Sequence, residues 1–253
     1  MQTINRAVEL LTLLSTRPDG ISVSELSVTM NLSLGTTHRF LMSLYDNGLV
    51  VQDKATKQYR LGFKILRLAS NLLNKDRLTD VARLPMRKAA STVKNVVYLC
   101  QENSGEVICT HCEDPTTEMH SKFAAQIGNE MPFYAAATAK IIFAYQPATI
   151  RMLFERQKPL TRFTARTKTS LEDILIDSEK NIAQGYALCN EELEKGVIAA
   201  AAPIFNYDGR VIASVGVTGI KGNLSMDTMR KAVCECARTI SIELGFSKTD
   251  SQR

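Results

Sequence analysis

The sequence has neither of the segments that would place it in or across a membrane. No apolar run reaches membrane-spanning length, and the N-terminus lacks the basic-then-apolar pattern of a signal peptide. We therefore expect a cytoplasmic protein with no membrane partner. Without a secretion signal, the six cysteines are expected to be reduced thiols rather than a disulfide framework.

The sequence is also poor in the residues on which many enzymes depend. It has only three histidines, and it contains no Gly-x-Ser-x-Gly motif, phosphate-binding loop or metal-ligand pair. Glu191, Glu192 and Glu194 form a cluster, but such a cluster is more typical of a solvated loop than of an acid–base pair. We expect a protein that is not an enzyme and has no cofactor. An enzyme fused to a DNA-binding domain is the alternative.

What the sequence does have is a helical pattern with an unusual polar face. In residues 31–50, "NLSLGTTHRFLMSLYDNGLV", Leu41 and Leu44 lie three apart and give a helix an apolar face. The opposite face carries Thr36 and Arg39, where an ordinary solvated face would carry Glu and Lys. Short hydrogen-bonding groups beside an Arg suit a close approach to a polar, anionic partner.

A second, shorter helix is expected just before this one. Ser22 and Glu25 are spaced as a capping box that starts a helix over about residues 23–30. Ser33 is expected to cap the next helix, over about residues 34–46. Two helices joined by a tight turn are the outline of a helix-turn-helix. An ordinary helical hairpin in an all-α domain is the alternative, because this shape also occurs where no DNA is bound.

The residues that follow favour DNA binding. Residues 47–62, "NGLVVQDKATKQYRLG", predict two strands around a polar turn, and Lys54 and Lys57 in that turn can neutralise phosphates. A hairpin in this position is the wing of a winged helix. An apolar helical stripe within residues 4–14 would close the small core. Residues 1–67 hold eight Lys and Arg against five Asp and Glu, a modest basic excess that agrees with nucleic-acid binding.

We therefore predict a winged helix-turn-helix DNA-binding domain over residues 1–62. Arg39 matches guanine in the major groove, and Ser33 with the first-turn amides can hold a phosphate. The predicted partner is double-stranded operator DNA. A purely architectural DNA binder would need a more basic surface and no large second domain. The predicted DNA-contacting residues, in the recognition helix and the wing, are Ser33, Thr36, His38, Arg39, Lys54 and Lys57.

The rest of the chain predicts a linker helix and a second domain. Residues 63–78 carry an apolar stripe that is too wide for a lone helix. A second copy of the chain is the natural partner, and packing on the same chain's second domain is the alternative. Residues 79–247 predict an antiparallel sheet with helices packed on it, so the chain is α+β. A helix is expected over about residues 81–94, with Pro85 in its first turn, and residues 248–253 are expected to be a disordered tail.

The cysteines allow sharper chemical interpretations. Cys109, Cys112 and His120 resemble half of a zinc site, but a second ligand pair is missing. On a regular strand Cys109 and Cys112 point to opposite faces, so their thiols are not expected to converge. A redox sensor at Cys189 would lack an electropositive neighbour in the sequence. We predict no metal site, and a thiol- or metal-responsive regulator is kept as the alternative function.

Together the motifs resemble the IclR family of bacterial transcription regulators, over about residues 3–246. The N-terminal motifs are "LSLGTTHRFL", "DNGLV" and "YRLG"; the later ones are "MPFYAAATAKIIFA", "GYALCNEELEKGVIAAAAPIFN" and "ISIELG". The resemblance implies a winged-helix domain joined by a linker helix to a GAF-like α/β effector-binding domain. It also implies a homodimer or a dimer of dimers, and a ligand-responsive repressor or activator that we expect to control a catabolic operon.

The resemblance also implies an effector pocket built from four separate segments. Its positions in this chain are Met131, Ala137, Thr138, Cys189, Gly216 and Thr218. The chain departs from the family pattern here, because Cys189 stands where the family usually has Asp, and Leu34-Gly35 replaces a Lys-Ser pair. A pocket with small side chains and no acid at position 189 is expected to bind a small organic or sugar acid.

Overall fold

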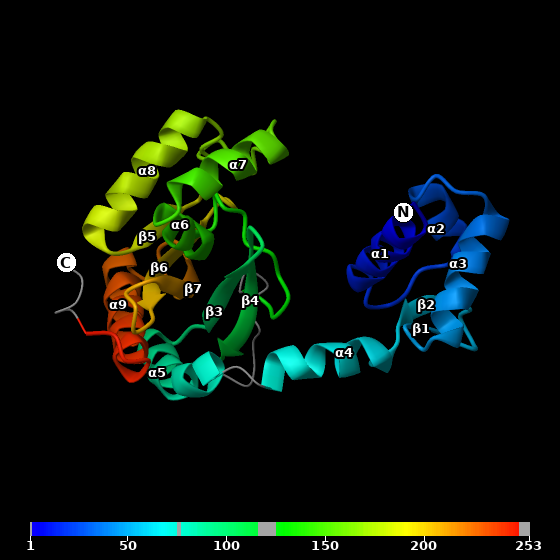
Figure 1. Cartoon of the computed structure of the whole chain (residues 1–253), viewed down its shortest axis with the longest axis horizontal. Coiled ribbons are helices and arrows are strands. Elements are labelled where there is room, and N and C mark those ends of the chain that lie inside the picture. The colour runs from blue at the N-terminus through cyan, green and yellow to red at the C-terminus, as the bar shows by residue number, and fades with distance from the viewer. Residues whose placement is uncertain (1, 75–76, 116–124, 248–253) are drawn as a thin grey trace. The chain divides into compact units, whose positions relative to one another are not determined.

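The computed structural model describes most of the chain, in three stretches: residues 2–74, 77–115 and 125–247. Within these stretches the chain forms nine helices and seven strands (Figure 1). They belong to two compact units, Met1–Lys75 and Asp76–Arg253. None of the described helices is both long enough and apolar enough to span a bilayer. The tail predicted over residues 248–253 lies outside the described residues.

The first unit has the element order of a winged helix. Its elements are α1 (Gln2–Ser15), α2 (Val23–Thr29), α3 (Leu34–Asp46), β1 (Val50–Gln52), β2 (Tyr59–Leu61) and α4 (Phe63–Asn74). The predicted cap of α2 is confirmed, because the Ser22 hydroxyl accepts a hydrogen bond from the amide of Glu25 at 3.2 Å. Leu10, Leu26 and Leu41 are fully buried and close a small core between α1, α2 and α3.

A close backbone crossing fixes where the wing begins and ends. The amide of Gly62 donates to the carbonyl of Leu49 at 2.8 Å. A Cβ atom at Gly62 would lie 2.3 Å from the carbonyl oxygen of Gly48, so only glycine fits there. The end of β2 is thereby held against the segment that leaves α3, and the wing keeps a fixed position beside that helix.

The second unit is built on one antiparallel sheet. Its strands are β3 (Val97–Asn103), β4 (Glu106–Glu113), β5 (Ala187–Asn190), β6 (Val197–Phe205) and β7 (Val211–Ile220). They lie in the order β4-β3-β7-β6-β5, so β4 and β5 are the edges. Strands β6 and β7 form a hairpin whose turn contains Asp208 and Gly209.

Helices cover both faces of this sheet. Two of them, α5 (Arg77–Val93) and α9 (Met226–Glu243), pack on one face around Met86, Met229 and Val233. Three others, α6 (Ala137–Ala144), α7 (Pro147–Gln157) and α8 (Leu171–Gln184), lie toward the other face (Figure 1). The predicted α+β architecture with an antiparallel sheet is confirmed.

One predicted helix boundary was wrong. Helix α5 begins at Arg77 rather than near residue 81, so Pro85 lies inside the helix and not in its first turn. The helix extends toward its N-terminus because Leu78 and Ala82 are buried against the sheet. That burial outweighs the loss of one backbone hydrogen bond at the proline.

Candidate DNA-binding and effector sites

The head of α3 is held by its own polar side chains. The Ser33 hydroxyl accepts a hydrogen bond from the amide of Thr36 at 3.2 Å and donates one to the Thr36 hydroxyl at 2.8 Å. Thr37 is fully buried and donates to the carbonyl of Ser33 at 3.1 Å. His38 and Arg39 are exposed on the first turns of the same helix. The predicted recognition residues therefore stand on a fixed, capped helix start.

The wing tip is organised by Asp53. Its carboxylate accepts hydrogen bonds from the amides of Ala55 and Thr56 at 2.9 and 2.8 Å, and these bonds hold the pKa of Asp53 below its ordinary value. The same carboxylate pairs with Arg60 at 3.1 Å. Lys54 is exposed on this ordered turn, and so is Lys57. Because Asp53 is already paired, the tip presents the positive charge of its lysines.

A cavity of about 240 Å³ lies in the second unit between the sheet and the start of α6. Four of the six residues that the resemblance placed in the effector pocket line it: Met131, Ala137, Cys189 and Thr218. The lining that sequence reasoning missed consists of Tyr98, Ala125, Asn129, Glu130, Ala136, Leu193, Glu194, Val197 and Ala199.

The other two predicted pocket residues lie behind the cavity wall. Thr138 is fully buried and does not line the cavity. A Cβ atom on Gly216 would lie 2.6 Å from Cγ2 of Thr138 and 2.9 Å from Cε2 of Tyr98. Gly216 is therefore the residue that allows Tyr98 and Thr138 to pack against β7, which sets the shape of the cavity floor.

The polar groups of the cavity are divided between its floor and its mouth. On the floor, the hydroxyl groups of Tyr98 and Thr218 lie 2.8 Å apart, and burial raises the pKa of Tyr98. Helix α6 begins at the lining residue Ala137, and its N-cap residue, Ala136, makes no side-chain capping hydrogen bond. The free amides of a helix N-terminus favour negative charge. At the mouth, Glu130 and Glu194 are exposed carboxylates.

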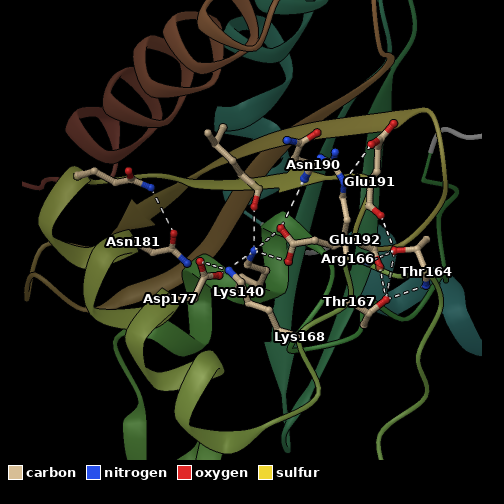
Figure 2. Close-up of polar contacts among 12 residues, drawn as sticks. Lys140, Thr164, Arg166, Thr167, Lys168, Asp177, Asn181, Asn190, Glu191 and Glu192 are labelled. Atoms are coloured by element: carbon tan, nitrogen blue, oxygen red, sulfur yellow. Dashed lines mark hydrogen bonds and ion pairs between the residues drawn. The ribbon is translucent and has the colours of Figure 1, made fainter.

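A buried ion cluster joins elements that carry residues of the cavity wall (Figure 2). The ammonium of Lys140 lies 2.9 Å from Oε2 of Glu192 and 2.8 Å from Oδ2 of Asp177, and it donates to the carbonyl of Leu188 at 2.8 Å. Burial alone would lower the pKa of Lys140, but the two carboxylates outweigh this and raise it. Lys168 pairs with Asp177 from the surface side. The cluster ties α6, α8 and the β5–β6 loop together.

This cluster corrects the sequence interpretation of the glutamates as a solvated loop. Glu192 is buried, at 7% exposure, because Lys140 neutralises it. Glu191 is half-buried and pairs with Lys221 at 3.0 Å and Arg166 at 3.3 Å. Only Glu194 of the three is exposed. The sequence feature that could have indicated this buried cluster is Lys140, the one charged residue inside the apolar stretch "TAKIIFA".

The thiols of Cys109 and Cys112 do converge, contrary to the sequence expectation. Their sulfur atoms lie 3.5 Å apart. The pairing of β4 with β3 shifts at this point, since Leu99 faces His111 but Cys100 faces Cys109, and the extra residue reverses the alternation of side chains. A hydrogen bond with Cys100, together with burial, raises the pKa of Cys109 to about 12. The other proposed ligand, His120, lies outside the described residues.

A larger concavity, of about 600 Å³, lies between α9 and β6. Its walls are mainly apolar and include Phe205 and Phe246, whose rings stack 4.9 Å apart. The Ser241 hydroxyl on its wall is already used, because it donates to the carbonyl of Ala237 and accepts from the amide of Phe205. The smaller cavity at α6 combines a hydroxyl pair with free helix amides and is the better candidate for a polar ligand.

Two family models match this chain. The model for the IclR helix-turn-helix domain matches residues 3–54, and the model described as "Bacterial transcriptional regulator IclR C-terminal" matches residues 70–242. Among known proteins, the glycerol operon regulatory protein of Streptomyces coelicolor is 29% identical over 255 residues, which cover 98% of both chains. The transcriptional regulator KdgR of Escherichia coli is 27% identical and covers 89% of this chain and 86% of its own.

Solved structures share the fold. The IclR protein of Thermotoga maritima superimposes with a TM-score of 0.73 at 24% identity, covering 97% of this chain and all of its own. An IclR homologue of Microbacterium hydrocarbonoxydans, solved in complex with 4-hydroxybenzoate, gives a TM-score of 0.78 at 22% identity and covers 96% and 98% of the two chains.

Proposed function

Because the chain belongs to the IclR family of bacterial transcription regulators and is a ligand-responsive DNA-binding regulator, we propose which of its residues read DNA and which bind the effector. The proposed DNA-reading residues are those on the exposed head of α3 and at the wing tip. Arg39 and His38 reach base edges, Thr36 and Ser33 meet the backbone near the helix start, and the wing lysines contact phosphates. A regulator of this kind would act in the cytoplasm, where the operator DNA is.

The assembly that we propose is a homodimer or a dimer of dimers. Helix α4 exposes Phe63, Leu66 and Leu68, at 86, 60 and 62% of their surfaces. Leu66 and Leu68 are two residues apart, so the exposed apolar side chains lie on more than one side of the helix. Large exposed apolar side chains favour an interface with another protein surface. A second copy of this chain is the partner that pairs two recognition helices on one operator.

The effector that we propose is a small organic or sugar acid bound in the cavity at α6. The observation that carries this proposal is the position of the uncapped α6 N-terminus beside the Tyr98–Thr218 hydroxyl pair in one cavity. A carboxylate would lie against the helix amides, away from the exposed Glu130 and Glu194, and a hydroxyl of the effector would meet the hydroxyl pair. The relatives that regulate a glycerol operon and bind 4-hydroxybenzoate support control of a catabolic operon.

A titration of operator binding tests this proposal. The full-length protein is bound to its own upstream intergenic DNA, and fluorescence anisotropy is followed while a panel of small acids and sugar acids is added, with 4-hydroxybenzoate and glycerol as two of the probes. We expect at least one acid to change operator affinity by a factor of about 5 to 150, the usual range of allosteric coupling. A response to neutral polyols alone would contradict the assignment of an acid effector.

A further inference from the structure

The segment of residues 158–170, which we name the clasp, contributes no residue to the effector cavity but touches both of its walls. One wall comes from residues 129–137 and the other from residues 189–199. These walls lie far apart in the sequence, and the clasp lies between them along the chain. An element that binds two walls without entering the cavity can set their spacing.

One end of the clasp binds the first wall through Tyr134. The Tyr134 hydroxyl donates to the carbonyl of Thr161 at 2.9 Å. Its ring also stacks on Phe163, with ring centroids 6.0 Å apart and planes 18° from parallel. Tyr134 lies two residues before the cavity-lining Ala136, so this contact fixes the main chain of the wall itself.

The other end of the clasp binds the second wall through two threonines (Figure 2). The Thr164 hydroxyl donates to the carbonyl of Glu191 at 2.6 Å, and the Thr167 hydroxyl donates to the carbonyl of Glu192 at 2.7 Å. The amide of Thr164 donates in turn to the Thr167 hydroxyl at 2.8 Å. Glu191 has a φ of +61°, a conformation that a non-glycine residue adopts only when its surroundings hold it.

The carbonyl groups of Glu191 and Glu192 lie between the floor and the mouth of the cavity along the second wall. Glu191 and Glu192 separate the buried floor residue Cys189 from Leu193 and Glu194 at the mouth. The side chain of Glu192 is held independently by Lys140. The ion pair therefore holds the side chain of Glu192, while the two threonine hydroxyls hold the main chain of the mouth, together with the Glu191 amide, which donates to the carbonyl of Val197 at 2.9 Å.

We propose that Thr164 and Thr167 are positioning residues of the effector site, and that their hydrogen bonds hold the mouth of the cavity closed over Cys189. The biological meaning of this proposal rests on the effector function proposed above. Release of the two bonds lets the main chain of residues 191–194 shift at the mouth while Lys140 still holds the Glu192 side chain, so effector affinity falls although no residue that touches the effector has changed.

The test measures how fast N-ethylmaleimide alkylates individual cysteines of the full-length protein, by peptide mass spectrometry. Cys189 reports opening of the cavity mouth. Cys236, which lies on α9 and is similarly buried, at 4% against 3% exposure, reports general unfolding. The double variant T164V/T167V keeps the side-chain volume and removes both hydroxyls. The matched control T164S/T167S keeps both hydroxyls.

We expect T164V/T167V to accelerate alkylation of Cys189 at least tenfold, which corresponds to about 1.4 kcal/mol, while Cys236 keeps its wild-type rate. The serine variant should match the wild type at both cysteines. Unchanged Cys189 labelling in T164V/T167V would overturn the proposal, and so would a parallel rise at Cys236 that recurs in the milder single variant T164V.

The labelling needs no ligand, so it separates this proposal from the effector function. If no acid changes operator binding while Cys189 still opens in the valine variant, the effector assignment fails and the positioning role of the clasp stands. If an acid changes operator binding and the midpoint of this effector titration is the same for the wild type and T164V/T167V, the positioning role fails and the effector assignment stands.

Discussion

The hydroxyl oxygens of Tyr98 and Thr218 lie 2.8 Å apart on neighbouring strands, at the floor of the effector cavity. Two hydroxyls share one proton in such a contact, so the second proton of the pair remains available for another acceptor. A phenol with its ordinary pKa of about 10 is already protonated at neutral pH, and burial raises the pKa of Tyr98 further. The pair can therefore donate a hydrogen bond to a bound ligand.

The first prediction concerns this pair. Thr218→Val and Tyr98→Phe each remove one hydroxyl, so an effector bound there loses hydrogen bonding that is worth about 1–3 kcal/mol. Each variant should need roughly tenfold more effector to release or bind the operator. Operator affinity without effector should be normal. Unshifted midpoints for both variants, and for Cys189→Leu as well, would place the ligand elsewhere.

The second prediction concerns the recognition helix. Arg39→Ala should weaken operator binding by about 1–3 kcal/mol and relax the preference at one base position. Lys57→Ala should weaken binding to operator and random DNA alike and flatten the salt dependence. Binding curves on both DNAs at several salt concentrations separate the two cases. An equal loss on both DNAs for Arg39→Ala would remove that residue from base reading.

The third prediction concerns assembly. Leu68 is 62% exposed on α4, and Leu68→Glu would place a charge in the proposed subunit interface. Light scattering should then detect a smaller species, and operator affinity should fall. Arg67→Gln, at the exposed neighbouring position, is the control and should keep the wild-type mass. Wild-type mass for a folded Leu68→Glu protein would contradict an interface at α4.

The fourth prediction contrasts two glycines. Gly216→Ala would place a Cβ atom 2.6 Å from Thr138, so we expect overpacking to lower the free energy of unfolding by about 1–3 kcal/mol. A Cβ atom at Gly35, in helix α3, would have no atom within 4 Å. We therefore expect Gly35→Ala to raise the free energy of unfolding by about 0.5–1 kcal/mol. Urea unfolding curves measure both. A Gly216→Ala protein as stable as the wild type would show that the floor can relax.

The fifth prediction concerns acid stability. Burial would raise the pKa of Asp177, but Lys140 and Lys168 overcome this and lower it. A lowered carboxyl pKa stabilises the fold above the ordinary value of about 3.9, and this stabilisation is lost as the pH falls through the folded-state pKa. The unfolding free energy of the wild type should therefore fall more steeply below about pH 4 than that of Asp177→Asn. Parallel curves would mean that Asp177 is not held ionised.

Local rules predicted both helix starts of the helix-turn-helix. Ser22 and Ser33 each accept a hydrogen bond from the amide three residues on, which is the geometry that a capping serine dictates within one turn. The wing was also predictable, because its turn and its alternation of side chains are local.

The remaining features depend on partners that are distant in the sequence. The convergence of Cys109 and Cys112 follows from a register shift against β3, which nothing in the four-residue pattern reveals. The burial of Glu192 follows from Lys140, 52 residues away. For the effector cavity, the resemblance supplied four lining residues, but the roles of Thr138 and Gly216 behind the wall depend on side-chain packing.

The ion cluster at Lys140 also has a consequence for solubility. Strand β5 is an edge of the sheet, and the edge of a sheet offers unpaired amides and carbonyls to strands of other molecules. Lys140 occupies the carbonyl of Leu188, and the Glu192 carboxylate lies 3.5 Å from the amide of Asn190. The outer rim of β5 is thereby occupied by charged side chains of its own chain. Lys140 and Glu192 therefore also disfavour intermolecular strand pairing and aggregation at this edge.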